Sequence, residues 1–309
     1  MTSALLAVVG PTASGKSLLA VAVAHRLAGL GNPAEIVSTD SMQVYRGMDI
    51  GTATPTTAER GGVVHHLLDV WEPSHAVTVA EFQAEARSAI ADILSRAAVP
   101  IVVGGSGLYV SAVLDDLRFP GTDPAVRARW EARLADEGAE RLHARLAELD
   151  PAAAQAILPT NGRRIVRALE VIEITGEPFV ARLPEPAEVL PAVRIGLDIP
   201  RDELDARIEQ RVDRMWEEGF VDEVRTLAAD GLSATPTAAR ALGYQQVLAF
   251  LEGEVTERQA RQETVDATRR FARRQQRWFR RDPRIHWIRY DSPSAVDEAL
   301  AVWASGTAT

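Results

Sequence analysis

The sequence contains no cysteine, so it cannot form a disulfide bond or offer a thiolate to a metal ion. Lysine is almost absent as well, because all but one of the 34 basic side chains are arginine and the exception is Lys16. No apolar run approaches the ~18 residues that indicate a membrane-spanning helix. The N-terminal apolar stretch lacks a basic leader, so we read it as a strand and not as a signal peptide. These absences predict a cytoplasmic enzyme that does not bind membranes.

The charge of the chain is acidic overall but basic in one segment. A formal net charge of −9 argues against a protein that coats nucleic acid. Seven of the thirteen residues from Arg269 to Arg281 are nevertheless arginine, and none of the thirteen is a carboxylate. This segment predicts a local surface for a phosphate backbone, although a basic helix can equally be a solvated face.

Apolar patterning predicts an α/β fold. Short apolar runs predict buried strands over residues 4–10, 35–40, 100–105, 193–200 and 285–290. Three- and four-residue apolar spacing predicts helices over residues 15–30, 78–98, 201–217, 219–230, 236–252, 256–281 and 293–304. Such alternation predicts a P-loop NTPase-like parallel sheet that is covered by helices on both faces.

The pattern changes between residues 122 and 190, where Ala, Arg and Glu prevail and no strand is expected. Helices are predicted over residues 124–136, 138–148 and 161–175. We therefore expect two domains. One is a P-loop core built from residues 1–120 and 192–309, and the other is an all-helical insertion from 121 to 191.

A phosphate-binding loop is predicted at residues 10–17. They read GPTASGKS, match G-x-x-x-x-G-K-[ST] and lie between a predicted strand and a predicted helix. Backbone N–H groups and the helix N-terminus of such a loop face an anion. Lys16 adds a full charge, and the Ser17 hydroxyl is the predicted ligand of Mg²⁺, the expected cofactor. The predicted diphosphate- or nucleotide-binding residues are Gly10, Pro11, Thr12, Ala13, Ser14, Gly15, Lys16 and Ser17.

An aspartate, Asp40, follows the second predicted strand. The carboxyl ends of parallel strands form the ligand crevice of an open α/β sheet, so we expect Asp40 beside the phosphate loop. Its carboxylate suits a general base or a Mg²⁺ ligand, unless it only caps a turn. His65 and His66 have no cysteine and no second carboxylate–histidine cluster nearby, so no metal site is predicted there.

Seven motifs, in their order along the chain, resemble those of the bacterial tRNA dimethylallyltransferases. They are GPTASGKS (10–17), DSMQVYRGMDIGTATP (40–55), HHLLDV (65–70), VGGSGLYV (103–110), RRIVRALEV (163–171), ALGYQQV (241–247) and TRRFARRQQRWFR (268–280). The resemblance extends from residue 4 to about residue 288. It implies that a dimethylallyl group is transferred from its diphosphate to the exocyclic amine of an adenosine adjacent to the anticodon of tRNA, with Mg²⁺.

The resemblance also implies roles for individual residues. Asp40 would be the general base on an adenine that is flipped out of its stack, and Lys16 with Arg211 would offset the charge of the leaving diphosphate. A monomer is the family expectation. The residues implied to contact tRNA are Asp40, Ser41, Met42, Gln43, Ser106, Arg127, Arg163, Arg164, Ile165, Val166 and Arg167. The arginine-rich segment adds Arg273, Arg274 and Arg277 to this set.

The chain departs from the family pattern at Thr54, which stands where lysine is usual and leaves the role of that position open. Three other functions compete. A small-molecule kinase would explain residues 1–110 but not the arginine-rich segment. An adenylate prenyl transferase would need neither that segment nor the helical insertion. A nucleotide-dependent tRNA-binding module without catalysis is disfavoured by Asp40 beside an intact phosphate loop.

Overall fold

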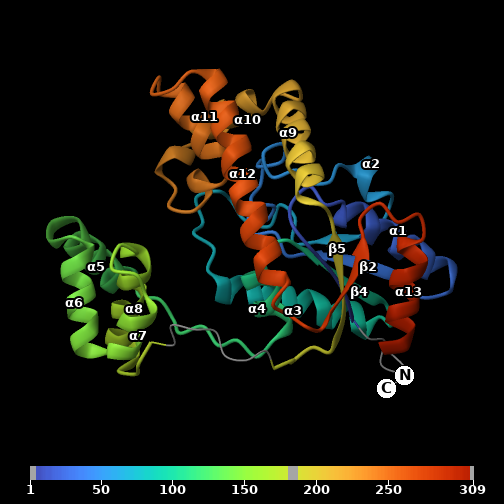
Figure 1. The fold of residues 1–309 in the computed structure, drawn as a ribbon, viewed down its shortest axis with the longest axis horizontal. Helices are drawn as coiled ribbons and strands as arrows, with labels where there is room; N and C mark the ends of the chain where they lie inside the picture. The colour runs from blue at the N-terminus through green and yellow to red at the C-terminus, as the bar shows by residue number, and fades with distance from the viewer. Residues whose placement is uncertain (1–4, 180–186, 307–309) are drawn as a thin grey trace. The chain divides into compact units, whose positions relative to one another are not determined.

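A computed structural model describes residues 5–179 and 187–306, and its core is one parallel sheet (Figure 1). The strands are β1 (Leu5–Val9), β2 (Ala34–Ser38), β3 (His65–His66), β4 (Val99–Gly104), β5 (Ala192–Asp198) and β6 (Ile285–Arg289). Their order across the sheet is β3-β2-β4-β1-β5-β6, and each neighbouring pair is parallel. The predicted α/β class is therefore confirmed.

Alternate residues of β1 face two different apolar cores. Leu5, Ala7 and Val9 pack in one core, whereas Leu6 and Val8 pack in the other. Because both faces are covered, the strand reads as a continuous apolar run and not as an alternation. The core around Leu6 contains side chains of α1 (Lys16–Gly29) and α13 (Ala295–Gly306), and the core around Leu5 contains side chains of α3 (Val79–Ser95) and α4 (Gly107–Leu114).

Four further helices follow β5 and complete the core unit. They are α9 (Arg201–Glu217), α10 (Phe220–Ala229), α11 (Tyr244–Leu251) and α12 (Glu257–Phe279). The helix predicted over 236–252 is wrong in its first half, because a short 3-10 turn occupies Ala238–Arg240 and α11 begins only at Tyr244. Gly243 has a left-handed φ of 88°, and a Cβ there would lie 2.9 Å from the Phe220 ring. This glycine interrupts the helix and packs against Phe220.

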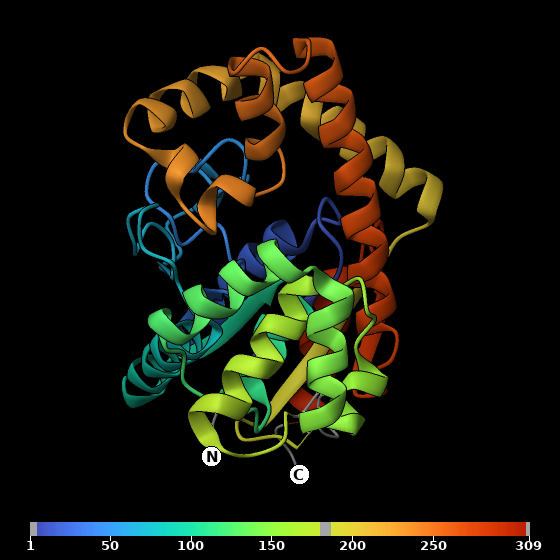
Figure 2. The same cartoon turned by 90° about the vertical axis from the view of Figure 1, so that its left-hand side faces the viewer.

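The helical insertion forms a compact unit of its own, Asp116–Ala187, while Met1–Asp115 and Glu188–Thr309 form the other unit. Both boundaries fall a few residues earlier than expected. Its helices are α5 (Pro124–Glu137), α6 (Ala139–Leu149), α7 (Pro151–Ala156) and α8 (Gly162–Thr175), drawn in green to yellow-green in Figure 2. Their core includes Trp130, Leu142, Leu146 and Leu169. No helix in the described ranges has the length and apolar character to cross a bilayer.

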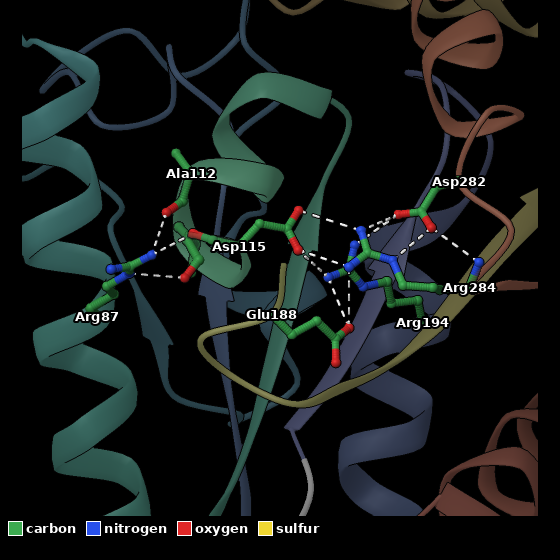
Figure 3. A network of polar contacts seen from close by, with 8 residues as sticks. Arg87, Ala112, Asp115, Glu188, Arg194, Asp282 and Arg284 are labelled. Carbon is green, nitrogen blue, oxygen red and sulfur yellow. Dashed lines mark hydrogen bonds and ion pairs between the residues drawn. The ribbon is translucent and has the colours of Figure 1, made fainter. Parts of the chain in front are cut away.

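A buried ion-pair cluster ties together the points where the core chain leads into and out of the insertion (Figure 3). Asp115 and Glu188 form an isolated antiparallel bridge. Arg194 on β5 is 2% exposed and donates to Asp115 at 2.8 Å, to Glu188 at 3.1 Å and to Asp282 at 2.8 Å. Arg284 also donates to Asp115 at 2.9 Å. The cluster therefore joins the two connecting segments to the sheet and to the start of β6.

Replacing Arg194 by Met should lower the free energy of unfolding by about 3 kcal/mol, because it removes the buried cation that pairs with the buried carboxylate of Asp115. Urea unfolding of the intact chain measures this loss. Arg289→Met is the matched control, since Arg289 pairs with Asp291 on the surface and its loss should leave the unfolding midpoint nearly unchanged. Equal midpoints for all three proteins would show that the cluster contributes no net stability.

Candidate functional site

The phosphate loop between β1 and α1 has an unusual backbone. Gly10, Ala13 and Gly15 have left-handed φ values of 147°, 62° and 98°. Ala13 carries a Cβ in this region, which costs strain that the surrounding structure must offset. Successive turns of this kind make a concave row of N–H groups. Because α1 begins at Lys16 without a side-chain cap, the N-terminus of the helix adds further N–H groups for an anion.

Three side chains from distant elements anchor the loop. Arg211 on α9 donates to Thr12 Oγ1 at 2.8 Å, and Arg207, one helical turn earlier, donates to Ala13 O at 2.8 Å. Gln275 on α12 is buried and accepts from Thr12 N at 2.9 Å. Arg211 was predicted from the sequence. Gln275 was missed, because the motif that contains it, TRRFARRQQRWFR, was interpreted only through its arginines.

The charge balance of the loop is set by Lys16, Arg211 and Asp40. Lys16 Nζ donates to Pro11 O at 2.6 Å. Burial lowers the pKa of Lys16 to about 7, and the charge of Arg211 acts in the same direction while that of Asp40 opposes it. Burial also lowers the pKa of Arg211. Lys16, Arg211 and Asp40 therefore influence one another electrostatically, and an anionic ligand beside Lys16 would favour its charged form.

A cavity of about 550 Å³ lies over this loop. Lys16, Ser17, Asp40, Arg211 and Gln275 line it. Apolar side chains also line it, namely Leu18, Val21, Ile36, Leu68 and Met215. The cavity therefore suits a ligand that joins a phosphate to an apolar group.

Asp40 lies two residues beyond β2, at the carboxyl edge of the sheet. Its Oδ1 accepts from Met42 N at 2.9 Å, so it does cap a turn, as one interpretation of the sequence proposed. The same carboxylate lines the cavity and influences the pKa of Lys16. Capping and a chemical role are compatible, because a carboxylate has about four lone-pair sites.

The residues after Asp40 divide into two groups. Gln43 and Thr54 line the cavity, whereas the side chain of Met42 packs against the apolar core. Ser41 is half-buried and is not part of the cavity lining. Ser106 precedes α4 directly after Gly105, another lining residue, and does not itself line the cavity.

The donor set at the cavity fits Mg²⁺ only in part. Among the described residues no three His, Asp or Glu side chains are grouped to hold a metal ion. Ser17 and Asp40 do line the same cavity. Mg²⁺ commonly takes one or two protein ligands and completes its shell with water and substrate phosphates, so these two oxygens are compatible with it. His65 and His66 instead contact Val63 O at 2.9 Å and Glu35 at 2.7 Å.

The RRIVR segment of the helical unit is partly structural. Arg163 and Arg164 are exposed, whereas Ile165 and Val166 are buried in the core of the unit. The prediction that Ile165 and Val166 contact tRNA is therefore corrected for their side chains, which pack between helices. Arg167 donates to Pro120 O, Gly121 O and Glu170.

Arg127 of the same unit has a fixed partner. Its guanidinium donates to Glu170 at 2.6 Å and 3.1 Å, and this carboxylate is fully buried. Because Arg167 also pairs with Glu170, the two arginines together neutralise one buried charge. Both side chains therefore hold the insertion together, whatever else they contact.

The arginine-rich segment begins on α12, extends past its end at Phe279 to Arg281, and presents two different faces. Three of its members meet carboxylates of the core unit, and we call them the paired arginines: Arg269 with Glu209, Arg273 with Asp205, and Arg280 with Asp198. Four others are exposed at helical spacing, and we call them the outward arginines: Arg270, Arg274, Arg277 and Arg281. Arg273, predicted to contact tRNA, thus belongs to the paired face, whereas Arg274 and Arg277 do not.

The aromatic residues beside these arginines pack within the core unit. A Cβ added to Gly107 would lie 2.1 Å from the Trp278 ring, so this ring rests directly on the start of α4. Phe279 is 3% exposed and belongs to the apolar core. The glycine at the centre of VGGSGLYV is therefore explained by the close approach of α12.

Comparison with known proteins agrees with this arrangement. A family model described as IPP transferase matches residues 43–282. A tRNA dimethylallyltransferase of Thermobifida fusca (strain YX) is 64% identical over 300 residues, covering 97% of this chain and 94% of that protein. The crystal structure of the full-length tRNA isopentenylpyrophosphate transferase from Bacillus halodurans aligns with a TM-score of 0.71 at 39% identity, over 99% of this chain and 98% of that one.

A further solved structure, a eukaryotic dimethylallyltransferase acting on tRNA, aligns with a TM-score of 0.78 over 98% of this chain and 77% of that chain. At 23% identity it shows the shared fold alone. The family model and the high-identity relatives, in contrast, cover most of the chain. The protein therefore belongs to the IPP transferase family.

Proposed function

We propose that this chain transfers a dimethylallyl group from dimethylallyl diphosphate to the exocyclic amine of an adenosine adjacent to the anticodon of tRNA, and releases diphosphate. The observation that carries the proposal is the cavity in which a phosphate loop, Asp40 and apolar side chains meet. The names of the high-identity relatives support the same reaction.

The donor is held by its two chemically different ends. The loop amides, the N-terminus of α1, Lys16 and Arg211 bind the diphosphate. The apolar side chains of the cavity, such as Ile36 and Leu68, suit the dimethylallyl group.

The acceptor amine needs help, because its lone pair is delocalised into the adenine ring. Asp40 accepts a hydrogen bond from the amine and takes its proton as the new C–N bond forms. The C–O bond of the allylic carbon breaks, and its electron pair leaves with the diphosphate. Lys16 and Arg211 offset the negative charge that grows on this leaving group.

Mg²⁺ is the proposed cofactor. The Ser17 hydroxyl and the diphosphate oxygens would hold it, with Asp40 as a second protein oxygen near the loop. When bound, the ion neutralises part of the charge on the leaving diphosphate.

The tRNA chain carries a phosphate on every nucleotide, and the protein offers exposed guanidinium groups to it. Arg163 and Arg164 on the insertion and the outward arginines on α12 are the proposed contacts. Of the other members of the tRNA-contact set, Asp40 and Gln43 line the cavity and Ser106 directly follows Gly105, a lining residue. An adenylate prenyl transferase would have no use for these exposed arginines, which favours a tRNA acceptor.

The purified chain should transfer label from radiolabelled dimethylallyl diphosphate to tRNA and not to AMP. Asp40→Asn should lower turnover at least about 100-fold with tRNA affinity nearly unchanged, because the carboxylate acts on the proton and not on the phosphates. Label in AMP alone would mean that the acceptor is a free nucleotide and not tRNA. A parallel loss of affinity and rate would assign Asp40 to binding.

Binding of dimethylallyl diphosphate should draw a proton onto Lys16. A lysine with a pKa of about 7 in the empty loop is about half protonated at pH 7, and the bound anion raises that pKa. The uptake should therefore be about half a proton at pH 7 and should grow toward pH 8. Calorimetry in two buffers of different ionisation enthalpy measures it.

The control for this titration is Lys16→Met, in which ionisation of the ligand itself is unchanged. The difference between the two proteins isolates the proton carried by Lys16. Equal uptake in both would mean that Lys16 already carries its charge in the empty loop.

The outward arginines should account for part of the salt dependence of tRNA binding. Changing all four to Gln should weaken binding and reduce the slope of log affinity against log salt, by about 0.9 for each duplex phosphate that the variant no longer neutralises. Changing the paired arginines to Gln is the matched control and should leave the slope unchanged. If the outward variant keeps the wild-type slope, this face does not meet phosphates.

A further inference from the structure

A turn over residues 49–54 lines the same cavity as Asp40, the candidate base, and accepts hydrogen bonds from Gln43. The Gln43 side-chain amide donates to Thr52 O at 3.3 Å and to Ala53 O at 3.1 Å. Its carbonyl accepts from Ser38 Oγ at 3.0 Å, and the same hydroxyl accepts from Asp40 N at 3.3 Å. The position of this turn is therefore coupled, through Gln43 and Ser38, to the backbone of Asp40.

The turn is itself held by one carboxylate from another element. Glu223 on α10 accepts from the backbone N–H groups of Asp49 at 3.0 Å, Ile50 at 2.7 Å and Gly51 at 3.3 Å. The Tyr244 hydroxyl also donates to Glu223, at 2.6 Å. Four donors converge on one side chain, and charge-assisted bonds of this kind are stronger than neutral ones.

Two aromatic rings pack directly against the same turn. A Cβ on Gly51 would lie 2.3 Å from the Phe220 ring and 2.4 Å from the Tyr244 ring. Both rings are fully buried and meet edge to face, with centroids 5.0 Å apart. The motifs around Gly51 and Tyr244 therefore pack directly against each other, although they lie almost 200 positions apart in the chain. The sequence by itself had suggested no function for the second motif.

We propose that Glu223 and Tyr244 are positioning residues, which hold the 49–54 turn so that Gln43 and Asp40 meet the target base. The inference rests on the proposed function and deepens it. Neither residue lines the cavity or touches a reacting atom, so both act through the turn. The backbone strain at Ala53, whose φ is 50°, is consistent with a turn that needs outside support.

The strongest alternative is that these contacts only stabilise the fold. A stabilising contact would lower the unfolding midpoint without a specific effect on one substrate. A positioning contact has a different signature, because a misplacement of about 1 Å can cost about 100-fold in rate. It should also depend on Gln43, the side chain through which it acts.

The test compares Glu223→Gln and Tyr244→Phe with Asp222→Asn, a neighbouring carboxylate on α10 that pairs with Arg225. Tyr244→Phe keeps the ring against Gly51 and removes only the hydroxyl. Each of the first two variants should lower kcat/KM for tRNA about tenfold, with KM for dimethylallyl diphosphate within about twofold of wild type. Asp222→Asn should behave as wild type.

Coupling between Glu223 and Gln43 distinguishes a positioning role of Glu223 from a purely stabilising one. In the Gln43→Ala background, Glu223→Gln should cost less than about twofold, since the side chain that it positions is gone. If the two single-variant losses of kcat/KM multiply in the double variant, the proposal is wrong. A fall in the unfolding midpoint that accounts for the whole loss of activity would also overturn it.

Amide hydrogen exchange keeps this test independent of the reaction. The amides of Asp49, Ile50 and Gly51 should exchange at least about tenfold faster in Glu223→Gln than in Asp222→Asn, because they lose a charged acceptor. If wild type transfers no label to tRNA, the proposed function fails while faster exchange still supports the Glu223 contact. Unchanged exchange would overturn the proposed support of the turn even in an active enzyme.

Discussion

The site depends on one electrostatic constraint, the closeness of two partly buried cations, Lys16 and Arg211, at the loop between β1 and α1. Burial lowers the pKa of both cations, so an anion bound at the loop would favour their charged forms. In the proposed reaction a diphosphate would be that anion, and the same cations would make it a better leaving group. Arg207 on α9 and Gln275 on α12 anchor the loop that carries Lys16, and Arg211 itself bonds to Thr12 of this loop.

Helix α12 combines several of these tasks in one element. Buried Gln275 reaches the phosphate loop, and Trp278 lies on Gly107 at the start of α4. The paired arginines join α12 to α9 and the end of β5, while the outward arginines remain exposed. A helix with 3.6 residues per turn separates these faces by sequence spacing alone. The count of arginines in this segment therefore overstates how many can reach a nucleic acid.

The acceptor side of the cavity is built differently from the donor side. We propose that the donor side is one continuous loop, which Arg207, Arg211 and Gln275 anchor from outside, whereas the acceptor side is assembled from several segments that support one another. Gln43 joins two of these segments, and Glu223 supports one of them from outside the cavity. The two sides still influence one another, because the charge of Asp40 acts on the pKa of both Lys16 and Arg211.

By itself the sequence determined the phosphate loop, the parallel sheet and the helical insertion, because glycine spacing and apolar periodicity are local properties. It also placed Asp40 at the correct edge of the sheet. Only the tertiary structure decided which side chains complete the site, since Gln275 and Thr12 lie 263 positions apart. It likewise buried Ile165 and Val166 and broke the helix expected over 236–252 at Gly243. Those outcomes depend on packing against distant elements, which no local pattern encodes.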